Sequence, residues 1–377
     1  MQKIMTIFGT RPEAIKMAPV VKQLAADDDD DETEPVVVVT GQHREMLKQV
    51  LNFFKIQPDY DLTIMTKNQR LDQITSRVLL GLDPILEQER PAMTLVHGDT
   101  TTTMAASLAS FYHQIPVGHV EAGLRTWDLT SPFPEEANRQ VTDNLASLYF
   151  APTVLSKQNL LKEHHPADRI IVTGNTAIDA LRYTVNQEYH HDVLDRIPAD
   201  HRIILLTMHR RENQGSPMTN VFQAVRDVAL ANPHVDVIYP VHLSPRVQEL
   251  AHQILEGIAN VHLIAPLDVV DFHNLAAWSH FIMTDSGGVQ EEAPSLNKPV
   301  LVLRDTTERP EGVTAGTLKL VGTDREQVGQ AMLTLLNDDQ QYQRITAAQN
   351  PYGDGHAAER IVDHCKHFLT QDIMSTR

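Results

Sequence analysis

Three carboxylates in the first half of the chain have the residue type and placement that proton transfer needs. Asp99 closes the sequence His-Gly-Asp, Glu121 closes His-Val-Glu, and Glu135 lies in Ser-Pro-Phe-Pro-Glu-Glu. Carboxylates that lie close together raise one another's pKa, which brings a proton donor or acceptor toward neutral pH. We therefore expect Asp99, Glu121 and Glu135 to meet in one cleft as acid and base groups.

Two other interpretations of these segments stay open. The sole role of Asp99 could be to cap a helix that starts near Thr100, and His97 and His119 could be hydrogen-bonded core residues. The His-x-Asp and His-x-Glu pairs also contain metal-ligand types, but neither spacing is a specific metal motif. We expect a site without a metal ion.

The first strand-to-helix junction, Phe-Gly-Thr-Arg-Pro, is a candidate anion site. Gly9 allows a tight turn, and free backbone amides at the start of the helix would favour an anion. Arg11 and Lys16 add positive charge. Arg11 could equally be an ordinary surface residue at a helix start.

A second candidate anion site lies in Thr-Asp-Ser-Gly-Gly-Val-Gln-Glu-Glu-Ala, residues 284–293. Ser286, Gly287 and Gly288 would let backbone amides approach a diphosphate at the positive end of a helix. Glu292, one turn later, could accept hydrogen bonds from ribose hydroxyls. Neither junction matches GxGxxG or GxxxxGK[ST], which argues against a nicotinamide cofactor and against a P-loop nucleotidase.

A histidine follows a predicted strand in the second half of the chain. His209 lies in Thr-Met-His-Arg-Arg-Glu and could stabilise the charge of a leaving phosphate, while Arg210 or Arg211 could bind an anion. A purely structural histidine is the alternative. His242 ends a similar segment, Tyr-Pro-Val-His, and its isolated signal is weak.

Short apolar runs that alternate with amphipathic stretches must position these residues. This alternation predicts right-handed βαβ units and two Rossmann-like domains with parallel sheets, at 1–172 and 173–356, and the last helix within 357–377 could pack back on the first. Ligands bind beyond the carboxyl ends of parallel strands, so the active site should lie there, in the cleft between domains. The predicted strands are 3–8, 36–40, 93–97, 117–120, 148–151, 203–208, 235–239, 261–264, 281–284, 300–303 and 318–321.

Composition narrows the class of protein. The 377 residues are enough for two domains, and the formal charge of −17 argues against a nucleic-acid partner. No apolar run approaches the roughly 18 residues that a membrane span needs, and the amino terminus lacks the pattern of a signal peptide. A single cysteine, Cys365, fits a reducing cytoplasm. The acidic run 27–31 is expected to be a solvated loop.

The motifs, in their order along the chain, resemble the non-hydrolysing UDP-N-acetylglucosamine 2-epimerase family of bacteria. The resemblance implies a glycosyltransferase-B-like fold and a cytoplasmic homodimer without a cofactor. It also implies that the substrate is UDP-N-acetylglucosamine and that the product, UDP-N-acetylmannosamine, supplies cell-surface polysaccharides. The segments that carry the resemblance are 9–16, 42–45, 97–103, 118–126, 131–138, 174–176, 209–212, 284–296 and 304–310.

The resemblance also implies roles for single residues. Asp99, Glu121, Glu135 and His209 match the family's catalytic positions. Positions expected around UDP are matched by Arg11, Lys16, Phe272, Ser286, Gly287, Gly288, Glu292 and Arg309.

Many members of the family are regulated by a second UDP-N-acetylglucosamine beside the active site. Gln42, Glu136, Arg210 and His242 match positions for such contacts. Glu45 stands where a glutamine is expected, Asn68 where an arginine is expected and Trp127 where a smaller residue is expected. These departures concern regulation and not catalysis.

Inversion at C2 of a closed sugar ring needs an electron sink, because no carbonyl adjoins that carbon. We expect the bond from the sugar to UDP to be this sink, with elimination to 2-acetamidoglucal and re-addition of UDP. A hydrolysing 2-epimerase or a UDP-sugar glycosyltransferase would share the nucleotide site and is the enzymatic alternative. A nucleotide-sugar sensor is the alternative without catalysis.

Overall fold

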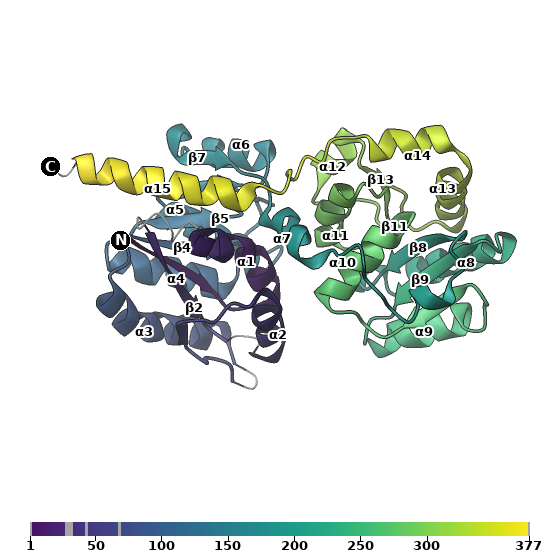
Figure 1. The fold of residues 1–377 in the computed structure, drawn as a ribbon, viewed down its shortest axis with the longest axis horizontal. Helices are drawn as coiled ribbons and strands as arrows, with labels where there is room; N and C mark the ends of the chain where they lie inside the picture. The colour runs from purple at the N-terminus through teal and green to yellow at the C-terminus, as the bar shows by residue number, and fades with distance from the viewer. Residues whose placement is uncertain (1, 27–32, 42–43, 67–68, 376–377) are drawn as a thin grey trace. The chain divides into compact units, whose positions relative to one another are not determined.

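The computed structural model describes the chain except for residues 1, 27–32, 42–43, 67–68 and 376–377. The acidic run, Gln42 and Asn68 therefore lie outside the described residues. The chain divides into two compact units, unit 1 with Met1–Ala180 and Gly353–Arg377, and unit 2 with Leu181–Tyr352 (Figure 1). The division falls inside helix α7 (Thr176–Thr184), a few residues after the boundary expected from the sequence.

Unit 1 is built on a seven-stranded parallel sheet in the order β3-β2-β1-β4-β5-β6-β7. Its strands are β1 (Gln2–Phe8), β2 (Thr33–Val39), β3 (Tyr60–Asp61), β4 (Met93–His97), β5 (Val117–Val120), β6 (Leu148–Ala151) and β7 (Ile170–Val172). Its helices besides α7 are α1 (Arg11–Ala26), α2 (Arg44–Phe54), α3 (Leu71–Glu89), α4 (Thr101–Tyr112), α5 (Glu135–Leu145), α6 (Val154–Lys162) and α15 (Ala357–Ser375).

Both faces of this sheet are covered, which explains why buried residues follow one another along β1, β2 and β4 and do not alternate with exposed ones. Ile4 and Phe8 of β1 join one core with α1, α2 and α15, while Met5 and Ile7 join the other with α3 and α4. Helix α15 therefore returns from the end of the chain to lie beside α1 (Figure 1).

Unit 2 is built on a six-stranded parallel sheet in the order β10-β9-β8-β11-β12-β13, with a separate core on each face. Its strands are β8 (Arg202–Thr207), β9 (Val235–Pro240), β10 (Val261–Ile264), β11 (Phe281–Thr284), β12 (Val300–Val302) and β13 (Leu318–Leu320). Its helices are α8 (Ser216–Ala231), α9 (Pro245–Leu255), α10 (Val269–Trp278), α11 (Gly287–Glu292), α12 (Pro310–Ala315), α13 (Arg325–Asn337) and α14 (Asp339–Thr346).

The described residues also include short 3-10 helices, η2 (Ala167–Arg169), η3 (Leu194–Arg196), η4 (Arg211–Asn213) and η5 (Ala293–Leu296). Among the described residues, no helix is both long enough and apolar enough to span a bilayer. The prediction of two parallel α/β domains is confirmed, and each sheet presents the carboxyl ends of its strands to the loops that carry the candidate site residues.

Candidate active site

Glu121 immediately follows β5 and is held in a strained backbone conformation. Its φ is +66°, a region that residues other than glycine adopt uncommonly. Its Oε1 accepts hydrogen bonds from Lys16 Nζ at 2.5 Å and from Asn175 Nδ2 at 2.9 Å. Nε2 of His97 lies 3.3 Å from its Oε2. Residues from three separate segments thus fix this carboxylate in one place.

Asp99 lies two residues after β4 and has a pKa suited to proton transfer. Burial raises the pKa of its carboxyl from the usual 3.8 to about 6; nearby Arg139 opposes this shift, and the negative charges of Glu121 and Glu135 add to it. Arg139 Nη2 lies 2.8 Å from Asp99 Oδ2. The N-cap of α4 is Thr100, whose hydroxyl accepts a hydrogen bond from the amide of Thr103. The side chain of Asp99 is therefore not the cap of this helix.

Glu135 begins α5, and its charge is close enough to contribute to the raised pKa of Asp99. The structure thus brings the three predicted carboxylates of unit 1 together. Glu136, the residue after Glu135, is buried, and its carboxylate oxygens accept hydrogen bonds from the amides of Thr126 and Trp127 at 3.0 and 3.1 Å. Glu136 therefore holds the loop before α5, and a regulatory contact by it stays a prediction.

His97 and His119 differ, although their sequence patterns are alike. His97 is buried, and neither nitrogen of its ring has a hydrogen-bond partner among the described residues. Burial lowers the pKa of the ring to about 3 despite the nearby Glu121, so the ring is neutral. The contact between His97 Nε2 and Glu121 Oε2 therefore joins a neutral ring and a carboxylate and is not an ion pair. His119 is a hydrogen-bonded core histidine, as the alternative interpretation of the sequence held.

The ring of His119 lies between two acceptors at the base of the site. Its Nδ1 is 2.6 Å from Asp143 Oδ1 and its Nε2 is 2.7 Å from the carbonyl oxygen of Gly98. The two contacts hold the imidazole ring in one orientation. Asp143 also accepts from Arg125 Nη2 at 2.6 Å and from the amide of Gly123 at 3.3 Å. This buried group thus contacts Gly98, which precedes Asp99, and Gly123, two residues after Glu121.

The first anion junction is not arranged as the sequence suggested. The amides of Gly9 and Thr10 were expected to be free, but both donate to Glu13 Oε2, at 2.8 and 2.6 Å. Glu13 thereby caps the loop from within, and Lys16 is paired with Glu121. Of the expected anion contacts, Arg11, half-buried at the start of α1, has no ion pair among the described residues.

In unit 2 the buried carboxylate of Asp285 organises the loop after β8. It accepts from the amides of His209 and Arg210 and, at 2.9 Å, from Asn213 Nδ2. Nδ1 of His209 lies 3.6 Å from Asp285 Oδ1, and its ring stacks on His242 with 14° between the planes. Burial lowers the pKa of His209; Asp285 opposes this shift, and His242 and Arg210 add to it.

The Ser-Gly-Gly segment faces two guanidinium groups. A Cβ atom added to Gly287 would lie 3.8 Å from Nη2 of both Arg210 and Arg309. Arg309 is held by an ion pair with Glu291, and Arg210 by Glu308 at 3.3 Å. These contacts place two positive charges beside the half-buried glycine backbone, an arrangement that can bind a diphosphate.

The remaining candidates lie on neighbouring elements of unit 2. Glu292 ends α11, and its Oε2 is 3.3 Å from Nε2 of the buried His273. Phe272, half-buried, lies next to His273 on α10. Ser286 immediately precedes α11, and its amide donates to Thr284 Oγ1 at 2.9 Å.

Several residues that build the site were missed in the sequence. Arg139, Asn175 and Asp285 each contact a candidate residue, yet none was singled out by itself. Arg139 lies four residues after Glu135, so helical periodicity could have placed both on one face. Among the described residues, the group with metal-ligand geometry, Asp200, His201 and His234, is not part of this site.

Comparisons with known proteins agree on a single family. Residues 25–366 match the family model described as UDP-N-acetylglucosamine 2-epimerase. The UDP-N-acetylglucosamine 2-epimerase of Bacillus subtilis (strain 168) is 60% identical over 361 residues, which cover 96% of this chain and 94% of that protein. The crystal structure of UDP-GlcNAc 2-epimerase from Neisseria meningitidis bound to UDP-GlcNAc is 48% identical and covers 96% of this chain and 99% of that chain, with a TM-score of 0.84.

A distant structure extends the likeness of the fold alone. The glycotransferase of kitacinnamycin is only 11% identical, yet it covers 98% of this chain and 99% of that chain, with a TM-score of 0.66. The glycosyltransferase-B-like fold expected from the sequence is therefore confirmed.

Proposed function

The chain belongs to the UDP-N-acetylglucosamine 2-epimerase family, and from that premise we propose that it interconverts UDP-N-acetylglucosamine and UDP-N-acetylmannosamine without a cofactor. The observation that carries the proposal is the group of carboxylates in unit 1. Asp99 has a pKa of about 6, and the negative charges of Glu121 and Glu135 contribute to raising it. Asp99 can therefore exchange a proton near neutral pH.

We propose elimination and re-addition as the chemical route. A carboxylate takes the proton from C2, the electrons of the C–H bond form a C1–C2 double bond, and the bond from C1 to the diphosphate oxygen breaks with its electrons on UDP. The intermediate is 2-acetamidoglucal. A proton is then delivered to the opposite face of C2, and the diphosphate oxygen attacks C1 again, so no oxidant or reductant is needed.

The residues of unit 1 divide this work. Asp99 or Glu121 exchanges the proton, and Glu135 is the second acid or a positioning group. Lys16 keeps the Glu121 carboxylate in place, since the two atoms are 2.5 Å apart. Arg139 and the charge of Lys16 limit how far the pKa of Asp99 rises. Balanced in this way, the carboxylates can take and return a proton within one turnover.

The residues of unit 2 and Arg11 serve the nucleotide. Arg309, Arg210 and the Gly287-Gly288 backbone stabilise the negative charge of the leaving diphosphate, and His209 assists them. Ser286, Glu292 and Phe272 complete the proposed contacts with UDP.

Proton NMR in heavy water tests the reaction. Incubation of UDP-N-acetylglucosamine with the protein should yield the manno product with deuterium at C2. Stoichiometric release of UDP would instead indicate a hydrolysing enzyme, and transfer of the sugar to an acceptor would indicate a glycosyltransferase. Binding without exchange at C2 would leave a sensor and overturn the proposal.

Amide substitutions test the roles of the carboxylates. Asp99→Asn, Glu121→Gln and Glu135→Gln should each lower turnover by roughly 100- to 10,000-fold, because a positioned acid or base contributes about that much. Binding of UDP should persist. Asp83→Asn is a matched control, since that carboxylate is exposed and pairs with His113. Near-normal turnover in all three site variants would contradict the assignment.

The assembly and regulation of the enzyme are proposed on the family resemblance. We propose a cytoplasmic homodimer that feeds the synthesis of surface polysaccharides, and the mass of the particle in solution tests the dimer. We also propose that Gln42, Glu136, Arg210 and His242 belong to a regulatory site for UDP-N-acetylglucosamine.

A further inference from the structure

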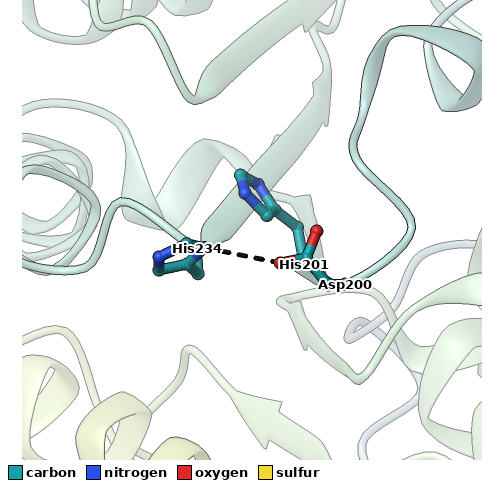
Figure 2. Close-up of side chains that lie close together, drawn as sticks. All are labelled: Asp200, His201 and His234. Carbon is teal, nitrogen blue, oxygen red and sulfur yellow. Dashed lines mark ion pairs between the residues drawn. The ribbon is translucent and has the colours of Figure 1, made fainter.

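Two histidines and an aspartate lie together at the amino ends of strands in the unit 2 sheet, whereas the candidate residues of unit 2 follow the carboxyl ends. His201 precedes β8 and His234 precedes β9. The parallel register pairs Arg202 with Val235, and the amide of Arg202 donates to the carbonyl oxygen of His234 at 3.0 Å. The backbone of the sheet therefore fixes the two histidines as neighbours. Asp200 extends from the same turn as His201 toward His234 (Figure 2).

The ring of His201 is oriented by a buried carboxylate. Asp236 Oδ2 lies 2.6 Å from Nδ1 of His201, and Asp236 Oδ1 lies 2.5 Å from Nε2 of His262. A carboxylate can only accept, so Nδ1 of His201 carries the proton and Nε2 keeps its lone pair in the neutral ring. Nε2 of His201 makes no hydrogen bond within the described part of the chain. A carboxylate behind a histidine in this way is the usual partner of a metal-bound imidazole.

The three side chains are within reach of a common ion. One ligand atom from each of Asp200, His201 and His234 lies within 4.8 Å of the others, and Nδ1 of His234 is 3.8 Å from Asp200 Oδ2. In a tetrahedral zinc site with bonds near 2.0–2.1 Å, ligand atoms are about 3.3 Å apart. The side chains of His234 and Asp200 are 76% and 77% exposed, so both can rotate by the small distance that remains.

We propose that Asp200, His201 and His234 bind a divalent transition-metal ion, with Zn²⁺ as the probe that defines the site. His201 is the preoriented ligand, His234 and Asp200 close on the ion, and water completes the coordination. Imidazole and carboxylate are suitable ligands for Zn²⁺, and the site lies at the amino ends of β8 and β9. The ion would join the turn before β8 to the loop before β9. It takes no part in the proposed epimerase chemistry.

Zinc titration calorimetry on metal-free full-length protein tests the proposal. The wild type should bind Zn²⁺ at micromolar concentration at this site, and His234→Ala and Asp200→Asn should each weaken that binding by at least about tenfold. Both altered side chains are largely exposed, so the fold should persist. His252→Ala is the matched control, because His252 is exposed and also lies beside a carboxylate, Glu256 at 3.3 Å.

Further measurements separate this site from other histidines. The wild type should bind one more zinc ion than His234→Ala, and Asp236→Asn should weaken binding without removing a ligand. Binding should also weaken as the pH falls, because a metal ion and a proton compete for the same imidazole nitrogen. Epimerase activity in metal-free buffer should be equal in the wild type and His234→Ala. The proposal would be overturned if the wild type and His234→Ala bound zinc with equal affinity and stoichiometry. It would also be overturned if the wild type bound no zinc at concentrations below about 1 mM.

Discussion

At the scale of single residues, the two carboxylates at the strand ends are controlled in different ways. Glu121 is fixed by direct partners, with Lys16 and Asn175 on one oxygen and His97 near the other. Asp99 forms an ion pair with Arg139, and burial has the largest effect on its pKa. The first arrangement favours a carboxylate with a fixed position and the second favours one with an adjustable charge. Asp99 is therefore the group whose protonation should appear in the pH dependence of the reaction.

The pKa of Asp99 leads to a prediction with a definite sign. With a pKa of about 6, Asp99 is about nine-tenths ionised at pH 7 and about one-tenth ionised at pH 5. If its carboxylate accepts the proton from C2, kcat/KM should rise with pH through about 6 and fall roughly tenfold from pH 7 to pH 5. Initial rates over this range measure the effect, with circular dichroism at each pH to show that the fold persists.

Two variants distinguish Asp99 from the other titrating groups. Asp99→Asn should lose the inflection along with most of its activity. His209→Asn should keep the inflection, which separates Asp99 from His209, whose pKa burial lowers from 6.5. An inflection that survives in Asp99→Asn, or a rate that falls as pH rises through about 6, would contradict the assignment of Asp99 as the base.

The sequence predicted the site residues that follow strands better than their partners. Asp99 and Glu121 could be placed because parallel strands end at the same edge of a sheet. The sequence did not reveal that Lys16 pairs with Glu121, because α1 and β5 are separated in sequence by about a hundred residues and only the fold brings them together. The expected contact of Lys16 with a phosphate stays a prediction. Glu13 is different: its three-residue spacing from Thr10 is a local capping pattern that could have been recognised.

At the scale of elements, the Ser-Gly-Gly segment before and within α11 makes a test of ligand approach possible. A Cβ atom at Gly287 would be 3.8 Å from two arginine side chains, an ordinary contact distance, and Gly287 is not among the glycines with positive φ. Gly287→Ala should therefore fold with unchanged thermal stability. The added methyl group would nevertheless occupy the space between the backbone and the guanidinium groups, so affinity for UDP should fall by about tenfold or more.

Gly329→Ala is the matched control for this substitution. Gly329 lies in α13, and nothing is within 4 Å of an added Cβ atom. It should leave UDP affinity unchanged and stabilise the protein by roughly 0.5–1 kcal/mol, because alanine favours a helix. Calorimetric titration with UDP and thermal melts give both quantities. Normal UDP affinity in Gly287→Ala would remove this segment from the proposed nucleotide site.

Elements were predictable where hydrophobic runs were long, and less so where strands were short. The apolar runs of β1, β4, β8 and β11 gave clear strands because both faces of each sheet are buried. The two-residue strand β3 was not predicted, since Tyr60 and Asp61 carry no periodic signal. The three-residue strand β7, at the edge of the first sheet, was not among the predicted strands either.

At the scale of the whole molecule, the chain leaves unit 1 at α7 and returns to it with α15. Sequence could suggest this return but could not establish it, because the apolar face of α15 does not specify its partner. Ile361, Val362, Cys365 and Leu369 of this helix are buried in the same core as Met17 and Val21 of α1. Both ends of the chain therefore contribute to one hydrophobic core, and the stability of unit 1 depends on a helix that follows all of unit 2.

The only cysteine of the chain reports on this packing. Cys365 is fully buried, and burial raises the pKa of its thiol, so it should react slowly with thiol reagents in the folded protein. Ile361→Ala removes buried methyl groups from the same face of α15 and should destabilise its packing by about 2–5 kcal/mol. Because each 1.4 kcal/mol corresponds to a factor of ten, modification of Cys365 should become roughly 30-fold faster or more. Asp363→Ala, on the exposed face of α15, is the control and should change the rate of modification little. Equal rates in the wild type and Ile361→Ala would contradict the prediction. They would show that α15 does not open independently and that the packing of α15 does not protect the thiol.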